Sequence, residues 1–104
     1  MNRPTLSSRR VSEALCTVIT EVALLEVALS GSQPVPVRSR RAALRRLAAA
    51  ERMLTPFRDL LTNSRAIVDQ LPGVRLALAQ ESDVLTERVR DFMSAVRALQ
   101  APAP

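Results

Sequence analysis

The sequence predicts an all-α fold, an antiparallel three-helix bundle with coiled-coil-like packing. The first observation is composition: of the 104 residues, 47% are apolar, 2% are aromatic and only 2 are glycine. Chains rich in alanine, leucine and arginine, as this one is, favour helices over strands. Secondly, turn residues divide the chain into segments, and thirdly, each segment carries an apolar stripe at helical spacing. A chain of this size builds one core, so we expect residues 1–104 to form a single domain.

The first helix is expected over residues 8–30. Its apolar residues alternate between spacings of four and three, which keeps one seam facing a neighbouring helix. The seam consists of Val11, Leu15, Val18, Val22, Leu25 and Leu29. Gly31 occupies the position of a left-handed C-terminal cap, and Pro34 and Pro36 cannot continue a helix because proline lacks an N–H group. Residues 1–7, and residues 100–104 at the other end, are expected to be flexible.

The second helix is expected over residues 38–71. Its seam contains Ala43, Leu47, Ala50, Leu54, Phe57, Leu61, Ser64, Val68 and Leu71, with one polar member. Pro56 interrupts this helix, and two outcomes are open. The helix is kinked, which we prefer because the seam keeps its phase from Leu54 to Phe57. Alternatively it breaks, with Thr55 capping a new helix that has Pro56 at its first position.

The third helix is expected over residues 73–99, after a turn at Pro72-Gly73 that folds the two long helices into a hairpin. Its seam consists of Leu78, Ser82, Leu85, Val89, Phe92, Val96 and Leu99. Three helices with matched seams and short connections form an antiparallel bundle.

Such a bundle leaves apolar surface uncovered at two places. At about 1.5 Å per residue, the first helix spans about 34 Å and the second about 50 Å, so the first cannot cover the hairpin tip. Further apolar residues of the first helix lie beside its main seam. We therefore predict a partner-binding surface formed by Leu24, Val27, Ile67, Leu71 and Leu76. The alternative is that the tip folds in on itself and the first helix sits centrally between its two neighbours.

A basic cluster opens the second helix. It contains Arg38, Arg40, Arg41, Arg45 and Arg46, and no acidic residue occurs between Glu26 and Glu51. These arginines therefore have no carboxylate at i,i+3 or i,i+4 in their own helix. With Leu47 and Leu54 in the core, a ridge of Arg38, Arg41, Arg45 and Arg52 would project from the opposite side.

The ridge could bind nucleic-acid phosphates, an acidic protein or an anionic membrane. The alternative is a solvated face whose arginines pair with carboxylates of neighbouring helices. Because Phe57 and Phe92 lie on core stripes, no aromatic platform remains for stacking bases. Nucleic-acid binding would therefore involve the phosphate backbone alone.

Enzymatic chemistry is not expected. The sequence contains no histidine, so Cys16 has no imidazole base to activate it. Asp83, Glu87 and Asp91 follow helical spacing, but ordinary pairing with nearby arginines is a better interpretation than a cation site. We expect no catalytic residue, no cofactor and no metal.

The compartment is predicted from few residues. A single cysteine suits the reducing cytoplasm. Glu13, Glu21 and Glu26 interrupt the apolar run of the first helix, which argues against a membrane span. The use of arginine without lysine hints at a bacterial or phage genome.

These features predict a non-enzymatic protein–protein interaction or assembly module, an adaptor or chaperone-like subunit. It would form a homo-oligomer or bind a partner helix through its apolar surfaces. The alternative is an accessory nucleic-acid-binding protein that contacts the phosphate backbone through the cluster Arg38–Arg46.

Overall fold

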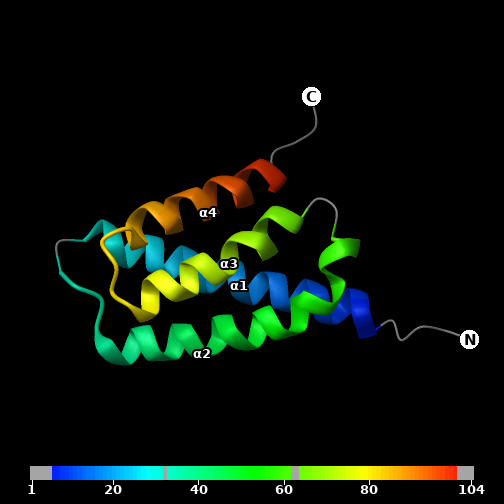
Figure 1. Cartoon of the computed structure of the whole chain (residues 1–104), viewed down its shortest axis with the longest axis horizontal. Helices are drawn as coiled ribbons and strands as arrows, with labels where there is room; N and C mark the ends of the chain where they lie inside the picture. Colours follow the sequence, from blue (N-terminus) through cyan, green and yellow to red (C-terminus); the bar gives the residue numbers. More distant parts are fainter. Residues whose placement is uncertain (1–5, 32, 62–63, 101–104) are drawn as a thin grey trace, which may run out of the picture.

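The computed structural model describes residues 6–31, 33–61 and 64–100, and the ends 1–5 and 101–104 lie outside this part. The elements are α1 (Leu6–Ser30), α2 (Val37–Leu54), the 3-10 helix η1 (Thr55–Leu60), α3 (Arg65–Ala79) and α4 (Leu85–Gln100) (Figure 1). The prediction of an all-α fold is confirmed. The prediction of three helices is wrong, because the described residues form four α-helices.

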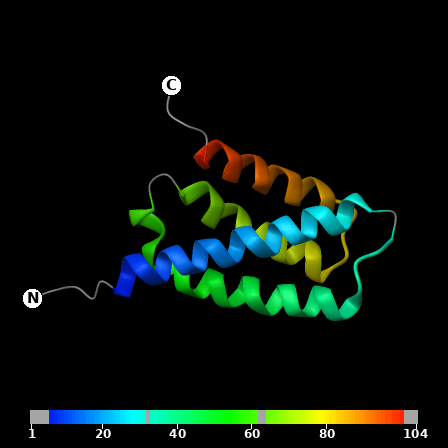
Figure 2. The same ribbon diagram turned by 180° about the vertical axis from the view of Figure 1, so that it is seen from behind.

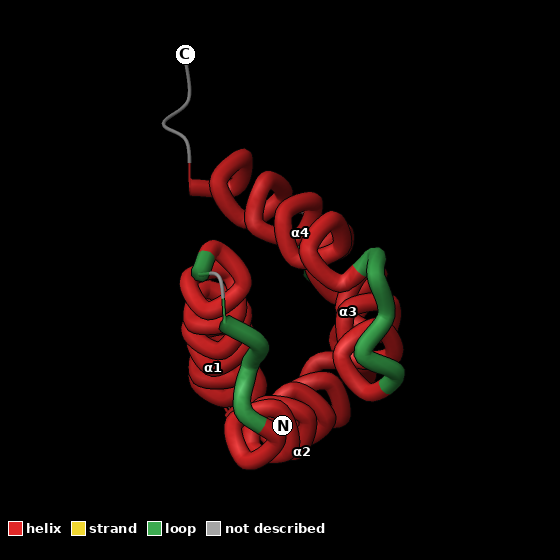
Figure 3. The backbone as a smooth tube through the Cα atoms, turned by 90° about the vertical axis from the view of Figure 1, so that its left-hand side faces the viewer, coloured by secondary structure: helices red, strands yellow, loops and turns green. Residues whose placement is uncertain are grey.

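The four helices form a ring in which consecutive helices run in opposite directions (Figure 1). α1 packs against α2 and α4, and α3 packs against the same two helices (Figure 2). Viewed along the bundle, α1 and α3 therefore lie at opposite corners, as do α2 and α4 (Figure 3). This is the up-down-up-down arrangement that short connections favour.

The core runs through the middle of this ring. Its largest fully buried side chains are Val18 and Val22 of α1, Leu47 and Leu54 of α2, Ile67, Leu71, Val74 and Leu78 of α3, and Val89, Phe92 and Val96 of α4. Most of them occupy the predicted seams, since a three-and-four spacing keeps side chains on one face of a helix. The hydrophobic pattern therefore predicted much of the core correctly.

The long second helix is broken at Pro56 rather than kinked. α2 ends at Leu54, and Pro56 is the second residue of the 3-10 helix η1, where its missing N–H costs no helical hydrogen bond. Thr55 does not cap the next helix, because its hydroxyl donates a 2.7 Å hydrogen bond backward to the carbonyl of Glu51. The break lets the chain turn, so that residues 65–79 return along the bundle as a separate helix.

Pro72 and Gly73 do not form the predicted turn; both lie inside α3. Side chains on both sides of Pro72, among them Val68, Leu71 and Val74, are buried on one face of this helix. Burying such side chains gains about 1.5–3 kcal/mol each, so together they outweigh the cost of about 3 kcal/mol for an internal proline.

The turn lies further along the chain, between α3 and α4. There Glu81 adopts a left-handed φ of 52°, and the N–H of Ser82 donates to the carbonyl of Ala77 at 2.9 Å. This is the Schellman ending of a helix, built here without glycine. The left-handed cap predicted at Gly31 is wrong, because neither glycine has a positive φ.

Candidate functional site

The five predicted partner-binding residues do not form one surface. Leu24 and Val27 on α1 are 58% and 71% exposed, and Leu76 on α3 is 58% exposed. Ile67 and Leu71 are only 1% and 0% exposed, because α3 carries them into the core instead of to a hairpin tip. α3, which carries Leu76, lies at the corner of the bundle opposite α1 (Figure 3). The exposed members thus separate into a pair on α1 and a single leucine on α3.

Leu24 lies at an apolar groove between α1 and α2, which we call the α1–α2 groove. The groove has a volume of about 320 Å³. The groove is lined by Glu21, Leu24, Leu25 and Ala28 of α1, by Val35 and Pro36 of the connecting loop, and by Ser39, Ala42, Ala43 and Arg46 of α2. Val27 lines an adjoining hollow together with Pro34, and both hollows share Ala28, Val35 and Pro36. The two hollows therefore adjoin one another, and the one that contains Leu24 is the more apolar.

An ion pair joins the two walls of this groove. Glu21 is a buried carboxylate, and Nη1 of Arg46 donates a 2.6 Å hydrogen bond to its Oε1. A carboxylate removed from water needs such a partner. The hydrogen bond and the attraction of the two charges raise the pKa of Arg46 above its ordinary value. Arg46 therefore links α1 to α2.

Arg40 of the predicted basic cluster is also paired across elements. It forms an ion pair with Glu81 in the turn between α3 and α4. The carboxylates that bind Arg40 and Arg46 are distant in sequence, so no local spacing could have identified them. For these two arginines the alternative interpretation holds: they pair with carboxylates of neighbouring elements.

The outward-facing arginines differ. Arg38, Arg41, Arg45 and Arg52 are all exposed, and we call them the basic ridge. Within the described residues none of the four forms an ion pair. Their spacing places them along one face of α2, and two of them, Arg38 and Arg45, are helical neighbours of Ala42 in the α2 wall of the α1–α2 groove. An apolar groove and an uncompensated positive charge therefore adjoin one another.

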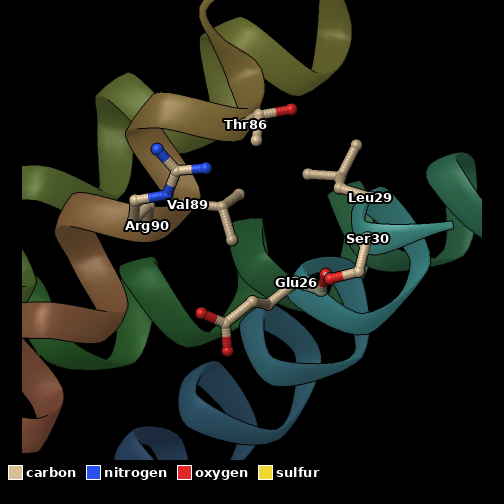
Figure 4. Close-up of a pocket in the computed structure, with 6 residues that line it drawn as sticks. All are labelled: Glu26, Leu29, Ser30, Thr86, Val89 and Arg90. Carbon is tan, nitrogen blue, oxygen red and sulfur yellow. The ribbon is translucent and has the colours of Figure 1, made fainter.

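Two further hollows lie beside α1. One, of about 150 Å³, lies between α1 and α4, with Glu26, Leu29 and Ser30 facing Thr86, Val89 and Arg90 (Figure 4). Glu26 also links α1 to α4, because its two carboxylate oxygens accept hydrogen bonds of 3.0 and 3.2 Å from Nη2 of Arg97. The other, of about 610 Å³, is wider and lies at the end of the bundle, where both Arg40 and Glu81 line it. It shares Val35 and Pro36 with the α1–α2 groove.

The described residues offer little for metal or covalent chemistry. They contain no cluster of three or more histidine, cysteine or acidic side chains that could hold a metal ion. Cys16 is exposed on α1 and has no histidine near it, since the sequence contains none. Among the described helices, none combines the length and the hydropathy needed to cross a membrane.

Comparisons with protein-family models, with curated proteins and with solved structures give no significant match for this chain.

Proposed function

We propose that this chain is a non-enzymatic protein–protein interaction module, an adaptor or chaperone-like subunit that acts through the apolar surface around the α1–α2 groove. The observation that supports the proposal is the exposure of Leu24 and Val27 beside this groove. As Cys16 is the single cysteine, we propose the reducing cytoplasm as its compartment.

Leu24 and Val27 have no packing role that explains their positions. The core of the bundle is filled by other residues of α1, among them Val18, Val22 and Leu25. Single exposed apolar side chains are ordinary on a protein surface, but an apolar groove lined on two sides is the usual form of a helix-binding site. Leu76 stands alone at another corner, and Ile67 and Leu71 belong to the core, so the proposal depends on the α1 pair.

The test is the combined variant Leu24→Glu/Val27→Glu, compared with Leu60→Glu/Leu76→Glu. All four side chains are exposed, so each variant should keep the helical content of the wild type. Size exclusion with light scattering measures self-association, and affinity capture from the native cell measures binding to other proteins. We expect the α1 variant to lose the associated species and the control variant to keep it. A monomer that captures no protein, or an unchanged α1 variant, would contradict the proposal.

A second candidate is an accessory nucleic-acid-binding protein, and the uncompensated basic ridge favours it. Contact through phosphates alone predicts binding to any duplex. Its affinity should fall steeply as the salt concentration rises, because the release of counterions from the DNA then favours binding less. Titration of a duplex DNA between 50 and 500 mM salt tests this prediction. Nucleic-acid binding through the ridge would be lost in Arg38→Glu/Arg41→Glu and kept in Leu24→Glu/Val27→Glu, whereas binding of a protein partner in the groove would be lost in Leu24→Glu/Val27→Glu.

A further inference from the structure

We propose that the α1–α2 groove binds an acidic amphipathic helix of another protein. Its apolar face would cover Leu24 and Val27, and its carboxylates would pair with Arg38, Arg41 and Arg45 of the basic ridge. The inference rests on the proposed function and extends it by naming the chemistry of the partner.

The geometry of α2 places the two kinds of contact side by side. Ser39, Ala42 and Arg46 line the groove. Arg38 lies four residues before Ala42 and Arg45 lies three residues after it, so both neighbour this groove residue on the helix surface, and Arg41 continues their column. Because a helix rises about 1.5 Å per residue, Arg38 and Arg45 are separated by about 10 Å along the axis. A helix lying in the groove would match this column with carboxylates at the same spacing of three and four.

The charge of this surface selects an acidic partner. No described carboxylate forms an ion pair with an arginine of the basic ridge. The beginning of α2 also has no acidic residue in its first turn, and no side chain caps its N-terminus. A helix N-terminus carries a partial positive charge, so it adds to the potential of the arginines instead of offsetting it. An apolar helix with basic flanks would meet repulsion here.

A second copy of the chain does not provide this combination. The acidic residues without an ion pair on or beside α4 are Asp83, Glu87 and Asp91. Most apolar side chains of α4, such as Val89 and Phe92, are buried in its own core, and its exposed Leu99 lies eight residues beyond Asp91. In a symmetric dimer formed through the groove, the two basic ridges would lie close to one another. Like charges at an interface oppose association, so a different, acidic chain is the better occupant.

The test uses three synthetic 18-residue peptides that share one leucine stripe at helical spacing. The positions beside the stripe are glutamate in the first peptide, glutamine in the second and lysine in the third. Fluorescence anisotropy of the labelled peptides measures binding to the full chain at 50 and 150 mM salt. We expect the glutamate peptide to bind at least about tenfold more tightly than the glutamine peptide, since several charge-assisted pairs are lost together. The lysine peptide should not bind.

Matched variants separate the two contributions. The variant Arg38→Glu/Arg41→Glu should no longer bind the glutamate peptide and should bind the lysine peptide instead. Arg88→Glu/Arg90→Glu on α4 changes the same number of charges and should bind like the wild type. Leu24→Ser should lower the affinity for the glutamate peptide severalfold without changing the preference for the glutamate peptide over the glutamine peptide. The helical signal and its thermal midpoint check that each variant is folded, and Arg38→Gln/Arg41→Gln replaces the double reversal if that protein is unstable.

Several outcomes would overturn the inference. Equal binding of the glutamate and glutamine peptides means that the groove does not select charge, and absence of binding by every peptide excludes a helix in the groove. If Leu24→Ser binds like the wild type while the ridge variant does not, the contact is electrostatic alone, as expected for a nucleic acid. Association lost in Leu24→Glu/Val27→Glu alongside any of these results would retain the proposed function and reject only the acidic helix.

Discussion

Arg46 of α2 donates a 2.6 Å hydrogen bond to Glu21 of α1, a carboxylate that the bundle buries. Arg45, its neighbour in sequence, is exposed and forms no ion pair within the described residues. Adjacent arginines of one helix thus have different environments. One links two helices, and the other belongs to the free basic ridge.

The first prediction concerns this pair. Arg46→Met should lower the urea concentration at the unfolding midpoint, because it leaves the buried carboxylate of Glu21 without its partner. Arg45→Met is the control and should leave the midpoint near that of the wild type, since it removes an exposed and unpaired charge. Glu21→Leu/Arg46→Met should recover part of the loss by removing both charges. Equal effects of the two single variants would show that the ion pair has no special role.

The second prediction distinguishes two leucines of α3. Leu71 is fully buried, so Leu71→Ala should lower the free energy of unfolding by about 2–5 kcal/mol through lost burial and a residual cavity. Leu76 is exposed, and Leu76→Ala should change it by no more than about 0.5 kcal/mol. Chemical denaturation followed by circular dichroism measures both. Similar losses in the two variants would contradict the placement of α3.

The third prediction concerns Gly73, which lies inside α3 with a helical backbone. A Cβ there would meet the guanidinium of Arg88 at 3.5 Å, an ordinary contact. Gly73→Ala should therefore raise the free energy of unfolding by about 0.5–1 kcal/mol, because alanine favours the helix. Denaturation measures this change. A hairpin turn at Pro72-Gly73 would give the opposite sign, so a clear loss of stability would reject the continuous helix.

The fourth prediction concerns pH. Ion pairs raise the pKa of Arg46 beside Glu21 and of Arg58 beside Asp69. The stability from a raised pKa is fully present below the unfolded-state value and is lost only as the pH rises through the folded-state value. Both values lie far above neutrality, and the sequence has no histidine. The thermal midpoint should therefore differ by less than about 3 °C between pH 6 and pH 8. A larger fall across this interval would require a group other than these arginines.

The candidate site was predicted only in part. Leu24 and Val27 lie beside the seam of α1, and that position alone predicted their exposure. Ile67 and Leu71 were assigned to an exposed tip because Pro72 and Gly73 are strong turn signals in any local pattern. The burial of α3 outweighs those signals, and it depends on packing against α2 and α4. Likewise the partners of Arg40 and Arg46 come from other elements, so sequence spacing gave no sign of them.

The sequence by itself determined that the chain is helical and which residues fill much of its core, because a spacing of three and four residues puts apolar side chains on one face of a helix whatever its neighbours. Only the tertiary structure decided where the chain turns. Local turn signals at Pro56 and Pro72 are similar in kind, yet α2 ends just before Pro56, whereas Pro72 lies within α3. The difference arises because residues on both sides of Pro72 are buried against other helices, which compensates the missing hydrogen bond. The residues of η1 around Pro56 include none that is buried, so no such gain holds a continuous helix there.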